Sequence, residues 1–531
     1  MSEMQDRSSS DQRQHPAASA EMQGRRIQGS KATSQGLRPC KSGGRAVTDV
    51  YTPVLPPFDH QRRAIVAGWD REAYGLLMEM GTGKSKVFID NMCMLYSRGM
   101  RRAVILAPKG MYANWPNIEL PKHVPPMFRD MMLVHMWEGG HSRREQEALV
   151  EMLRAGDGRI RVLVMNVEAL SMSQRAVRYL EQFVTRLEPC LFGVDESSTI
   201  KNPTAVRTKT IIKIGRHAEW RRIMTGTPLT RDPLDLWSQF EFLAPACLGQ
   251  SNFFAFKKRY AILEQKTFGG RKVDIPVGFR DVDHLGRLVR VHAFVATKEE
   301  CLDLPPKIYQ IRNVEMTDQQ ARLYRDLKEF CVAQIGTDTY MSVTVVVTQI
   351  LRLYQILLGR AVDEDGNVTK IPTRRMEAVR EIVEESSGKI IWWCSYREDV
   401  ADLVAHLRSL DRTVVQYDGG TSRDDRAAAV EMFQNGAADD FVGTVHTGGY
   451  GITLTAARTV VYYSNSPDAE KRWQSEDRAH RIGQTGSVLY IDLVTAGTVE
   501  ARFIEILKKK KSLSDMVMLE QELRQLLVGP D

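Results

Sequence analysis

Two short stretches of this sequence carry residue types that can act on a phosphate chain. In Gly81-Thr82-Gly83-Lys84-Ser85, two glycines precede a lysine and a hydroxyl residue. Glycines let backbone N–H groups turn toward phosphate oxygens, while the lysine can reach the β- and γ-phosphates and the serine can ligate Mg²⁺. In Asp195-Glu196, one carboxylate can hold Mg²⁺ and the other can deprotonate an attacking water. Together the two stretches predict hydrolysis of a nucleoside triphosphate.

The sequence around the glycine stretch predicts how it is held. The apolar run Tyr74-Gly75-Leu76-Leu77 precedes it and predicts a buried strand, and residues 87–92 predict a helix. Strand, glycine loop and helix form the arrangement of a phosphate-binding loop. Met78 is a departure, because the full pattern has glycine at that position. Taken alone, the stretch also fits a Gly-Lys-Ser turn without a ligand. The predicted nucleotide contacts here are Met80, Gly81, Thr82, Gly83, Lys84, Ser85 and Lys86, with Ser85 and Asp195 as the Mg²⁺ ligands and Lys84, Asp195 and Glu196 as catalytic residues.

Short apolar runs alternate with helical intervals along both halves of the chain. Such alternation predicts an α/β protein whose parallel sheets are covered on both faces. The ligand site of such a sheet lies outside the carboxyl ends of its strands, which is where Asp195-Glu196 falls. The predicted strands are residues 74–77, 103–107, 161–165, 190–194 and 222–224 in the first half, and 389–393, 413–417, 441–445, 459–463 and 488–492 in the second.

Composition bounds the class of protein. The 531 residues are long enough for two or three domains, and 43% hydrophobic with 26% charged residues is typical of a globular protein. A net charge of +7 is compatible with a polyanionic partner. Scattered cysteines argue against a zinc ribbon, and no apolar run is long enough to cross a membrane. We therefore expect an intracellular protein, cytoplasmic or nucleoid-associated, with a disordered basic tail at residues 1–50.

Two arginines in the second half are candidates for the same reaction. Arg478 and Arg481 are three residues apart and share one face of a predicted helix. Aimed at a γ-phosphate, such arginines would stabilise charge in the transition state. A solvent-exposed basic helix is the alternative interpretation. Upstream, the amide of Gln61 matches the donor and acceptor on one edge of adenine, although an ordinary helix residue would also fit.

The order of these motifs resembles superfamily 2 helicase motors, and within them the Swi/Snf-related ATPases. The resemblance covers about residues 55–510. It rests on Gln61, Gly-Thr-Gly-Lys-Ser, Asp-Glu-Ser-Ser at 195–198, Thr-Gly-Thr-Pro at 225–228 and the Gln-x-x-x-Arg-x-x-Arg element that begins at Gln474. It implies two tandem RecA-like lobes with ATP and Mg²⁺ between them. Gln474 and Gly451, a glycine-loop residue, are then further nucleotide contacts. The implied lobes span residues 51–300 and 301–531, with small helical insertions near 244–300 and 330–375.

By the same resemblance, the expected activity is a DNA-stimulated ATPase that translocates on double-stranded DNA as a monomeric motor, with single-stranded DNA as a second possible partner. The alternatives are a strand-separating helicase on DNA or RNA, and a nucleotide-gated DNA-binding module with little turnover. Ser198 stands where the family commonly has histidine, so the coupling of hydrolysis to DNA is open. No appended reader, zinc or nuclease domain is predicted, and a bacterial or viral source is favoured.

Overall fold

The computed structural model describes residues 51–508, apart from 141, 187, 227–231, 269–270, 303, 338–342, 364–365, 449–451 and 467. The described residues belong to one compact unit, Val47–Asp531. The predicted tail at residues 1–50 and the predicted nucleotide contact Gly451 lie outside the described residues.

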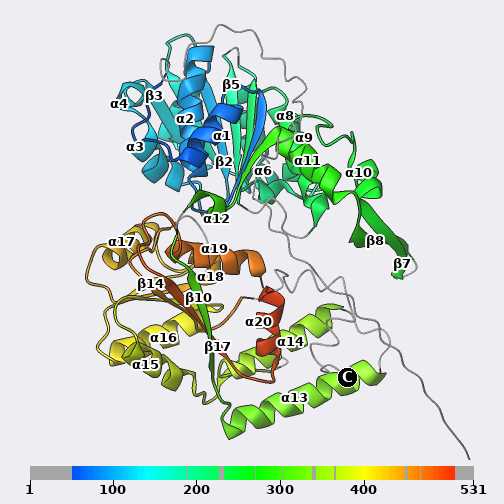
Figure 1. Cartoon of the computed structure of the whole chain (residues 1–531), viewed down its shortest axis with the longest axis vertical. Helices are drawn as coiled ribbons and strands as arrows, with labels where there is room; N and C mark the ends of the chain where they lie inside the picture. The colour runs from blue at the N-terminus through cyan, green and yellow to red at the C-terminus, as the bar shows by residue number, and fades with distance from the viewer. Residues whose placement is uncertain are drawn as a thin grey trace, which may run out of the picture. The chain divides into compact units, whose positions relative to one another are not determined.

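The first half of the chain forms a seven-stranded, all-parallel sheet in the order β3-β4-β2-β5-β6-β1-β9 (Figure 1). Its strands are β1 (Ala73–Met78), β2 (Arg102–Ala107), β3 (Met132–Met136), β4 (Ile160–Asn166), β5 (Cys190–Asp195), β6 (Trp220–Thr225) and β9 (Ala293–Ala296). All five strands predicted in this half are present. Strands β3 and β9 lie at the two edges and were not predicted.

Both faces of this sheet are covered, as the apolar runs predicted. Alternate residues of a strand point to opposite faces, so Leu76 and Met78 join one hydrophobic cluster while Leu77 joins another. Helices α1 and α2 contribute to the first cluster, and α7, α8 and α9 to the second. The helices of this half are α1 (Asp59–Gly68), α2 (Lys84–Leu95), η2 (Tyr96–Arg98), α3 (Leu120–His123), α4 (Pro126–Arg129), α5 (Arg143–Met152), α6 (Ala169–Met172), α7 (Gln174–Val184), η4 (Ser197–Ile200), α8 (Val206–Gly215), η5 (Pro233–Asp235) and α9 (Leu236–Leu243), with a π-helical turn, η3 (Trp115–Glu119).

The second half forms a six-stranded parallel sheet in the order β10-β17-β16-β13-β15-β14. Its strands are β10 (Lys307–Asn313), β13 (Ile390–Cys394), β14 (Val414–Tyr417), β15 (Asp440–Thr444), β16 (Thr459–Tyr462) and β17 (Val488–Val494). Trp392 and Trp393 pack on opposite faces, in different clusters. The helices are α15 (Arg375–Glu385), α16 (Arg397–Ser409), α17 (Arg423–Gln434), α18 (Val445–Gly448), α19 (Ala469–Ala479) and α20 (Val499–Lys508). The predicted two-lobed α/β layout is therefore confirmed.

The predicted insertions are not purely helical. Near 244–300, α10 (Phe253–Tyr260) and α11 (Val282–His292) flank an antiparallel hairpin of β7 (Ala261–Phe268) and β8 (Arg271–Phe279). The hairpin between these helices was not predicted, although Val273, Ile275 and Val277 alternate with a period of two and favour a strand. The second region contains α13 (Asp318–Thr337), α14 (Val343–Leu357) and a short hairpin, β11 (Arg360–Val362) and β12 (Val368–Lys370). The predicted lobe limits remain predictions. Among the described residues, no helix is both long and apolar enough to cross a bilayer.

Candidate active site

The glycine loop connects β1 to the first turn of α2, as the sequence predicted. Gly81 and Gly83 have φ of 81° and 89°, in the left-handed region that favours glycine. A β-carbon on Gly83 would lie 2.3 Å from Nε2 of Gln61. The loop therefore requires glycine at this position for both its backbone conformation and its space.

Two side chains of α1 hold the loop from the side. Nε2 of Gln61 donates to the Thr82 carbonyl oxygen at 2.9 Å, and Nε2 of His60 lies 2.8 Å from the same oxygen. Oε1 of Gln61 accepts from the Phe58 N–H at 3.1 Å. Both ends of the Gln61 amide are thus used within the protein. Gln61 positions the loop, and its contact with adenine stays a prediction.

The two lysines of the loop differ in their partners. Nζ of Lys84 donates to the carbonyl oxygen of Met78 at 2.9 Å and lies 3.4 Å from that of Glu79, so it folds over the loop. Nζ of Lys86 is bound instead to Oδ2 of Asp90 at 2.5 Å. The Lys84 ammonium therefore lies over the glycine loop, whereas the Lys86 ammonium is paired with Asp90, and the phosphate contacts of both lysines stay a prediction.

Asp195 ends β5 and is held by two donors. The Trp115 indole Nε1–H donates to Oδ2 at 3.0 Å, and the Glu196 N–H donates to Oδ1 at 3.0 Å. Burial, together with the neighbouring Glu196 carboxylate, raises the pKa of Asp195 to about 7. A buried carboxylate in this condition favours a nearby cation.

Glu196 adopts a backbone conformation that is unusual for its residue type. Its φ is 46°, one of four positive values among the described residues other than glycine. Such strain is concentrated at functional sites, where surrounding contacts hold it. Here Oε2 of Glu196 accepts from the Thr225 hydroxyl at 3.2 Å. The strain and this hydrogen bond fix the direction of the second carboxylate.

The donor set around Asp195 fits Mg²⁺. Carboxylate and hydroxyl oxygens are the ligands that this ion prefers, and Asp195 and Ser85 supply one of each. A further carboxylate, from Glu119 in η3, accepts a hydrogen bond from Ser85. Burial raises the pKa of Glu119, and Arg481 acts in the opposite direction. Glu119 therefore adds an oxygen donor beside Ser85, and the binding of Mg²⁺ by Ser85 and Asp195 stays a prediction.

The predicted arginines lie close to the glycine loop and the two carboxylates. Cβ of Arg481 is 3.0 Å from where a β-carbon on Gly81 would stand. Burial lowers the pKa of Lys84, and the carboxylates of Glu196, Asp195 and Asp477 oppose that shift. Burial likewise lowers the pKa of Arg478 to about 10, with Arg481 adding to the shift and Asp477 and Glu196 opposing it. Lys84, the two carboxylates and both arginines therefore share one electrostatic neighbourhood.

The remaining predicted contacts are less directly placed. Gln474 is buried in α19, and its Nε2 donates to Oε1 of Glu470 at 3.1 Å. The backbone of Met80 packs on Gly226, where an added β-carbon would come within 2.9 Å of the Met80 nitrogen. The glycine loop therefore packs against Gly226, which directly follows β6.

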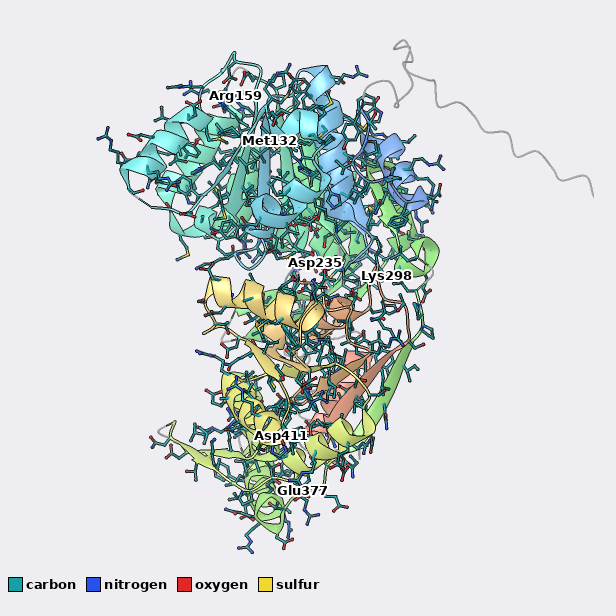
Figure 2. The ribbon with its side chains drawn as sticks, turned by 90° about the vertical axis from the view of Figure 1, so that its left-hand side faces the viewer. Met132, Arg159, Asp235, Lys298, Glu377 and Asp411 are labelled. Atoms are coloured by element: carbon teal, nitrogen blue, oxygen red, sulfur yellow. The ribbon has the colours of Figure 1, made fainter. Side chains whose placement is uncertain are left out.

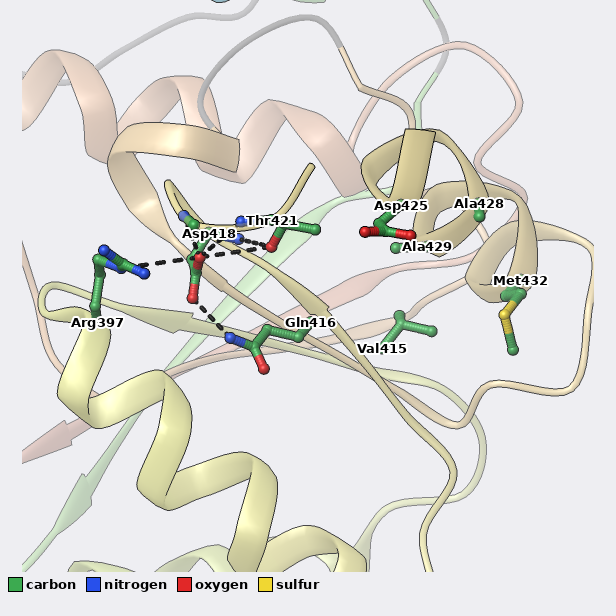
Figure 3. Close-up of a pocket in the computed structure, with 10 residues that line it drawn as sticks. Arg397, Val415, Gln416, Asp418, Thr421, Asp425, Ala428, Ala429 and Met432 are labelled. Carbon is green, nitrogen blue, oxygen red and sulfur yellow. Dashed lines mark hydrogen bonds and ion pairs between the residues drawn. The ribbon is translucent and has the colours of Figure 1, made fainter. Parts of the chain in front are cut away.

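A separate hollow of about 490 Å³ opens over β14 and α17 (Figure 3). Oδ1 of Asp418 accepts there from the Gly420 N–H at 2.6 Å and from the Thr421 N–H at 3.2 Å. Gln416 donates to its other oxygen at 2.7 Å. These bonds hold Asp418 to its own loop. None of the residues that line the hollow is a predicted site residue, so the hollow is not part of the candidate site.

Three contributors to the site were not predicted as site residues. Trp115 belongs to an Asn-Trp pair visible in the sequence, but its bond to Asp195 spans 80 positions. Glu119 reaches Ser85 because Trp115–Glu119 is a π-helical turn, and such turns occur frequently at functional sites. His60 is adjacent to Gln61, and only the fold shows that it shares the Thr82 carbonyl.

Family comparison gives two matches along the chain. The SNF2-related domain matches residues 60–362, and the helicase conserved C-terminal domain matches residues 374–483. The uncharacterized ATP-dependent helicase MG018 of Mycoplasma genitalium is 25% identical over 459 residues, which cover 85% of this chain and 41% of that protein. The human TATA-binding protein-associated factor 172 is 26% identical over 394 residues, covering 64% of this chain and 21% of that protein.

This chain spans less than half the length of those relatives. Among solved structures, the Sulfolobus solfataricus SWI2/SNF2 ATPase core in complex with dsDNA aligns with a TM-score of 0.40 at 21% identity, covering 91% of this chain and 99% of that one.

Proposed function

We propose that this chain is an ATP-hydrolysing motor that translocates on double-stranded DNA. The chain belongs to the family defined by the SNF2-related domain, and the relative MG018 is named as an ATP-dependent helicase, which supports the use of ATP. The observation that carries the proposal is the common electrostatic neighbourhood of Lys84, Asp195, Glu196, Arg478 and Arg481. These are the groups that phosphoryl transfer to water requires, and they come from both halves of the chain.

Each group has a distinct part in the proposed reaction. The loop N–H groups and Lys84 bind and orient the β- and γ-phosphates. Ser85 and Asp195 would hold Mg²⁺, which offsets charge on the phosphate oxygens when bound. Glu196, directed by Thr225, accepts a proton from the attacking water. Arg478 and Arg481 stabilise negative charge that develops on the transferring phosphoryl group.

Nucleotide binding and release would then drive the motion. Lys84 now rests on the loop carbonyls, and a bound triphosphate would give it stronger, charged partners. The same triphosphate would attract the two arginines of the second half, and hydrolysis would remove that attraction. Repeated cycles along a duplex that touches both halves would produce stepping. DNA would be bound mainly through its phosphates, so binding should weaken steeply with salt.

Steady-state ATPase assays with and without duplex DNA test the proposal. Lys84→Ala should abolish turnover, and Glu196→Gln should bind ATP while hydrolysing it at least about a hundredfold more slowly. Strong stimulation by duplex would exclude a binding module with little turnover. Near-normal turnover of Glu196→Gln would instead show that another residue activates the water.

The mode of movement requires a second pair of assays. Displacement of a third strand from a triplex reports pulling along an intact duplex, whereas displacement of a duplex strand reports unwinding. A motor that translocates without unwinding gives the first signal alone. A strand-separating helicase gives the second signal, and its ATPase responds more strongly to single strands than to duplex.

A further inference from the structure

One lysine outside the predicted site connects the glycine loop to the segment that carries both arginines. Lys298 begins the short helix α12 (Lys298–Cys301), just after β9, the strand that pairs with β1. Its relative exposure is 9%, which is rare for a lysine without a specific partner. Lys298 is labelled in Figure 2, which draws the side chains as sticks.

The Lys298 ammonium binds the arginine segment at two points. Nζ donates to Oδ1 of Asp477, the residue before Arg478. It also donates to the carbonyl oxygen of His480, the residue before Arg481, at 2.9 Å. A single cation thus fixes the chain immediately ahead of each arginine. Burial lowers the pKa of Lys298, and Asp477 acts in the opposite direction.

The backbone of the same residue binds the glycine loop. Its N–H donates to Oε2 of Glu79 at 2.7 Å, and the Glu79 N–H donates to the Ala296 carbonyl oxygen at 2.9 Å. Glu79 lies between the last residue of β1 and the first residues of the loop. Lys298 therefore connects the phosphate-binding loop to the arginine segment through three hydrogen bonds, one from its backbone N–H and two from its ammonium.

A neighbouring lysine has a different partner. Nζ of Lys307 donates to Oε2 of Glu476 at 2.9 Å, and the Tyr309 hydroxyl donates to the same oxygen at 2.8 Å. Lys307 lies 3.5 Å from Oδ1 of Asp477, farther than Lys298 does. Asp477 is thus held chiefly by Lys298, while Glu476 is held by Lys307 and Tyr309.

We propose that Lys298 is a positioning residue for ATP hydrolysis, which sets the arginines against the phosphate-binding loop without touching the nucleotide. This proposal rests on the proposed function. Placement errors of about 1 Å can cost about a hundredfold in rate. Removal of the ammonium should therefore slow turnover, whereas nucleotide affinity, which depends on the loop, should change little.

The test compares Lys298→Met, Lys298→Arg, Asp477→Asn and the double variant Lys298→Met/Asp477→Asn in the full chain. We measure kcat and KM for ATP, the Kd of a fluorescent ATP analogue, and the melting temperature. For Lys298→Met we expect kcat to fall about tenfold or more, with Kd within about threefold of the wild type. Lys298→Arg should recover most of the loss, and the double variant should be no slower than the slower single variant, because the two groups act as one pair.

Lys370→Met is the matched control, since Lys370 also pairs with a carboxylate, Asp402, at 2.5 Å but is exposed and lies on the β12 strand. It should leave every measured value unchanged. The proposal is overturned if kcat of Lys298→Met stays within twofold of the wild type, if nucleotide affinity or melting temperature falls in parallel with kcat, or if the double variant is additive. Lys84→Ala separates the two hypotheses. If Lys84→Ala retains ATPase turnover, the proposed function fails. If Lys84→Ala loses turnover while Lys298→Met keeps the wild-type kcat, only the positioning role of Lys298 fails.

Discussion

A single indole N–H couples a π-helical turn to the candidate metal ligand. Trp115 is 2% exposed, and its Nε1–H donates to Asp195 from within η3. A hydrogen bond to a charged group contributes about 1.5–3 kcal/mol, so it can fix the carboxylate direction that Mg²⁺ needs. We therefore expect Trp115 to act on the reaction through Asp195.

Trp115→Phe should keep the packing of the ring and remove the donor. We expect the Mg²⁺ concentration for half-maximal ATPase to rise about tenfold, because the carboxylate loses its fixed orientation. ATPase assays titrated with Mg²⁺ at saturating ATP measure this. Trp69→Phe is the control, because Trp69 packs only at the border of the same hydrophobic cluster. An unchanged Mg²⁺ requirement in Trp115→Phe would contradict the positioning of Asp195 by this bond.

The raised pKa of Asp195 predicts a pH-dependent stability. The usual value is 3.8 and the folded value is about 7, because of burial and the Glu196 carboxylate. Between these values the folded protein binds more protons than the unfolded chain, so the free energy of unfolding falls as pH rises. Asp195→Asn lacks this dependence.

Without nucleotide or Mg²⁺, Asp195→Asn should therefore melt at a temperature close to that of the wild type near about pH 4 and above it by about 2 °C or more near pH 8. Differential scanning calorimetry at both pH values measures the difference. The wild type could instead gain stability relative to Asp195→Asn between acid and neutral pH. That result would show that folding lowers the pKa of Asp195 and does not raise it.

At the scale of elements, the glycine loop depends on α1 as much as on β1 and α2. Gln61 and His60 converge on the Thr82 carbonyl, so the first turns of α1 support the loop. The space that a β-carbon on Gly83 would need is occupied by the Gln61 amide. A substitution at these contacts, in α1 or in the glycine loop, should therefore disturb nucleotide binding.

Gly83→Ala should weaken nucleotide binding by about tenfold or more, since it adds both strain and a clash. Gly99→Ala is a matched control: its φ is 93°, but nothing lies within 4 Å of the added carbon. Fluorescent nucleotide titration measures both variants. Equal affinities for Gly83→Ala and Gly99→Ala would mean that space at the loop is unimportant.

Sequence reasoning succeeded where local pattern and local chemistry coincide. The strands around Leu76, Ile105 and Trp392 are apolar runs that must be buried on both faces, and the fold confirms them. The edge strands β3, β9 and β10 were missed, although the edge strand β14 was predicted. Strand β10 has less burial to impose a pattern, since it exposes Ile308, Tyr309 and Ile311. Contacts such as that of Trp115 with Asp195 join positions far apart in the chain, and no local signal reports them.

At the scale of the whole molecule, a buried ion pair joins two helices of the second lobe. Arg375 and Glu500 are both fully buried, and NH2 of Arg375 donates to both carboxylate oxygens at 2.6 and 2.5 Å. NH1 also donates to the Tyr463 carbonyl oxygen at 2.5 Å. Helices α15 and α20 are thereby joined directly, although α20 lies beyond the family match at residues 374–483.

Glu500→Gln should destabilise the second lobe by about 3 kcal/mol, because it leaves a buried guanidinium without its counter-charge. Glu505→Gln, an exposed change on the same helix, should be neutral. Chemical denaturation followed by far-ultraviolet circular dichroism measures the unfolding midpoints of both variants. A Glu500→Gln midpoint equal to that of Glu505→Gln would show that the pair contributes no net stability.

The connection between the two sheets has a consequence for how often the halves meet. Strand β9 ends at Ala296 and β10 begins at Lys307, so only residues 297–306 join the edge of one sheet to the edge of the other. Ten residues reach at most about 35 Å when fully extended. A tether this short keeps the local concentration of the arginines near the phosphates in about the millimolar range. Cutting the backbone within 297–306 would replace this with an encounter between two separate molecules, whose ATPase rate would rise with protein concentration.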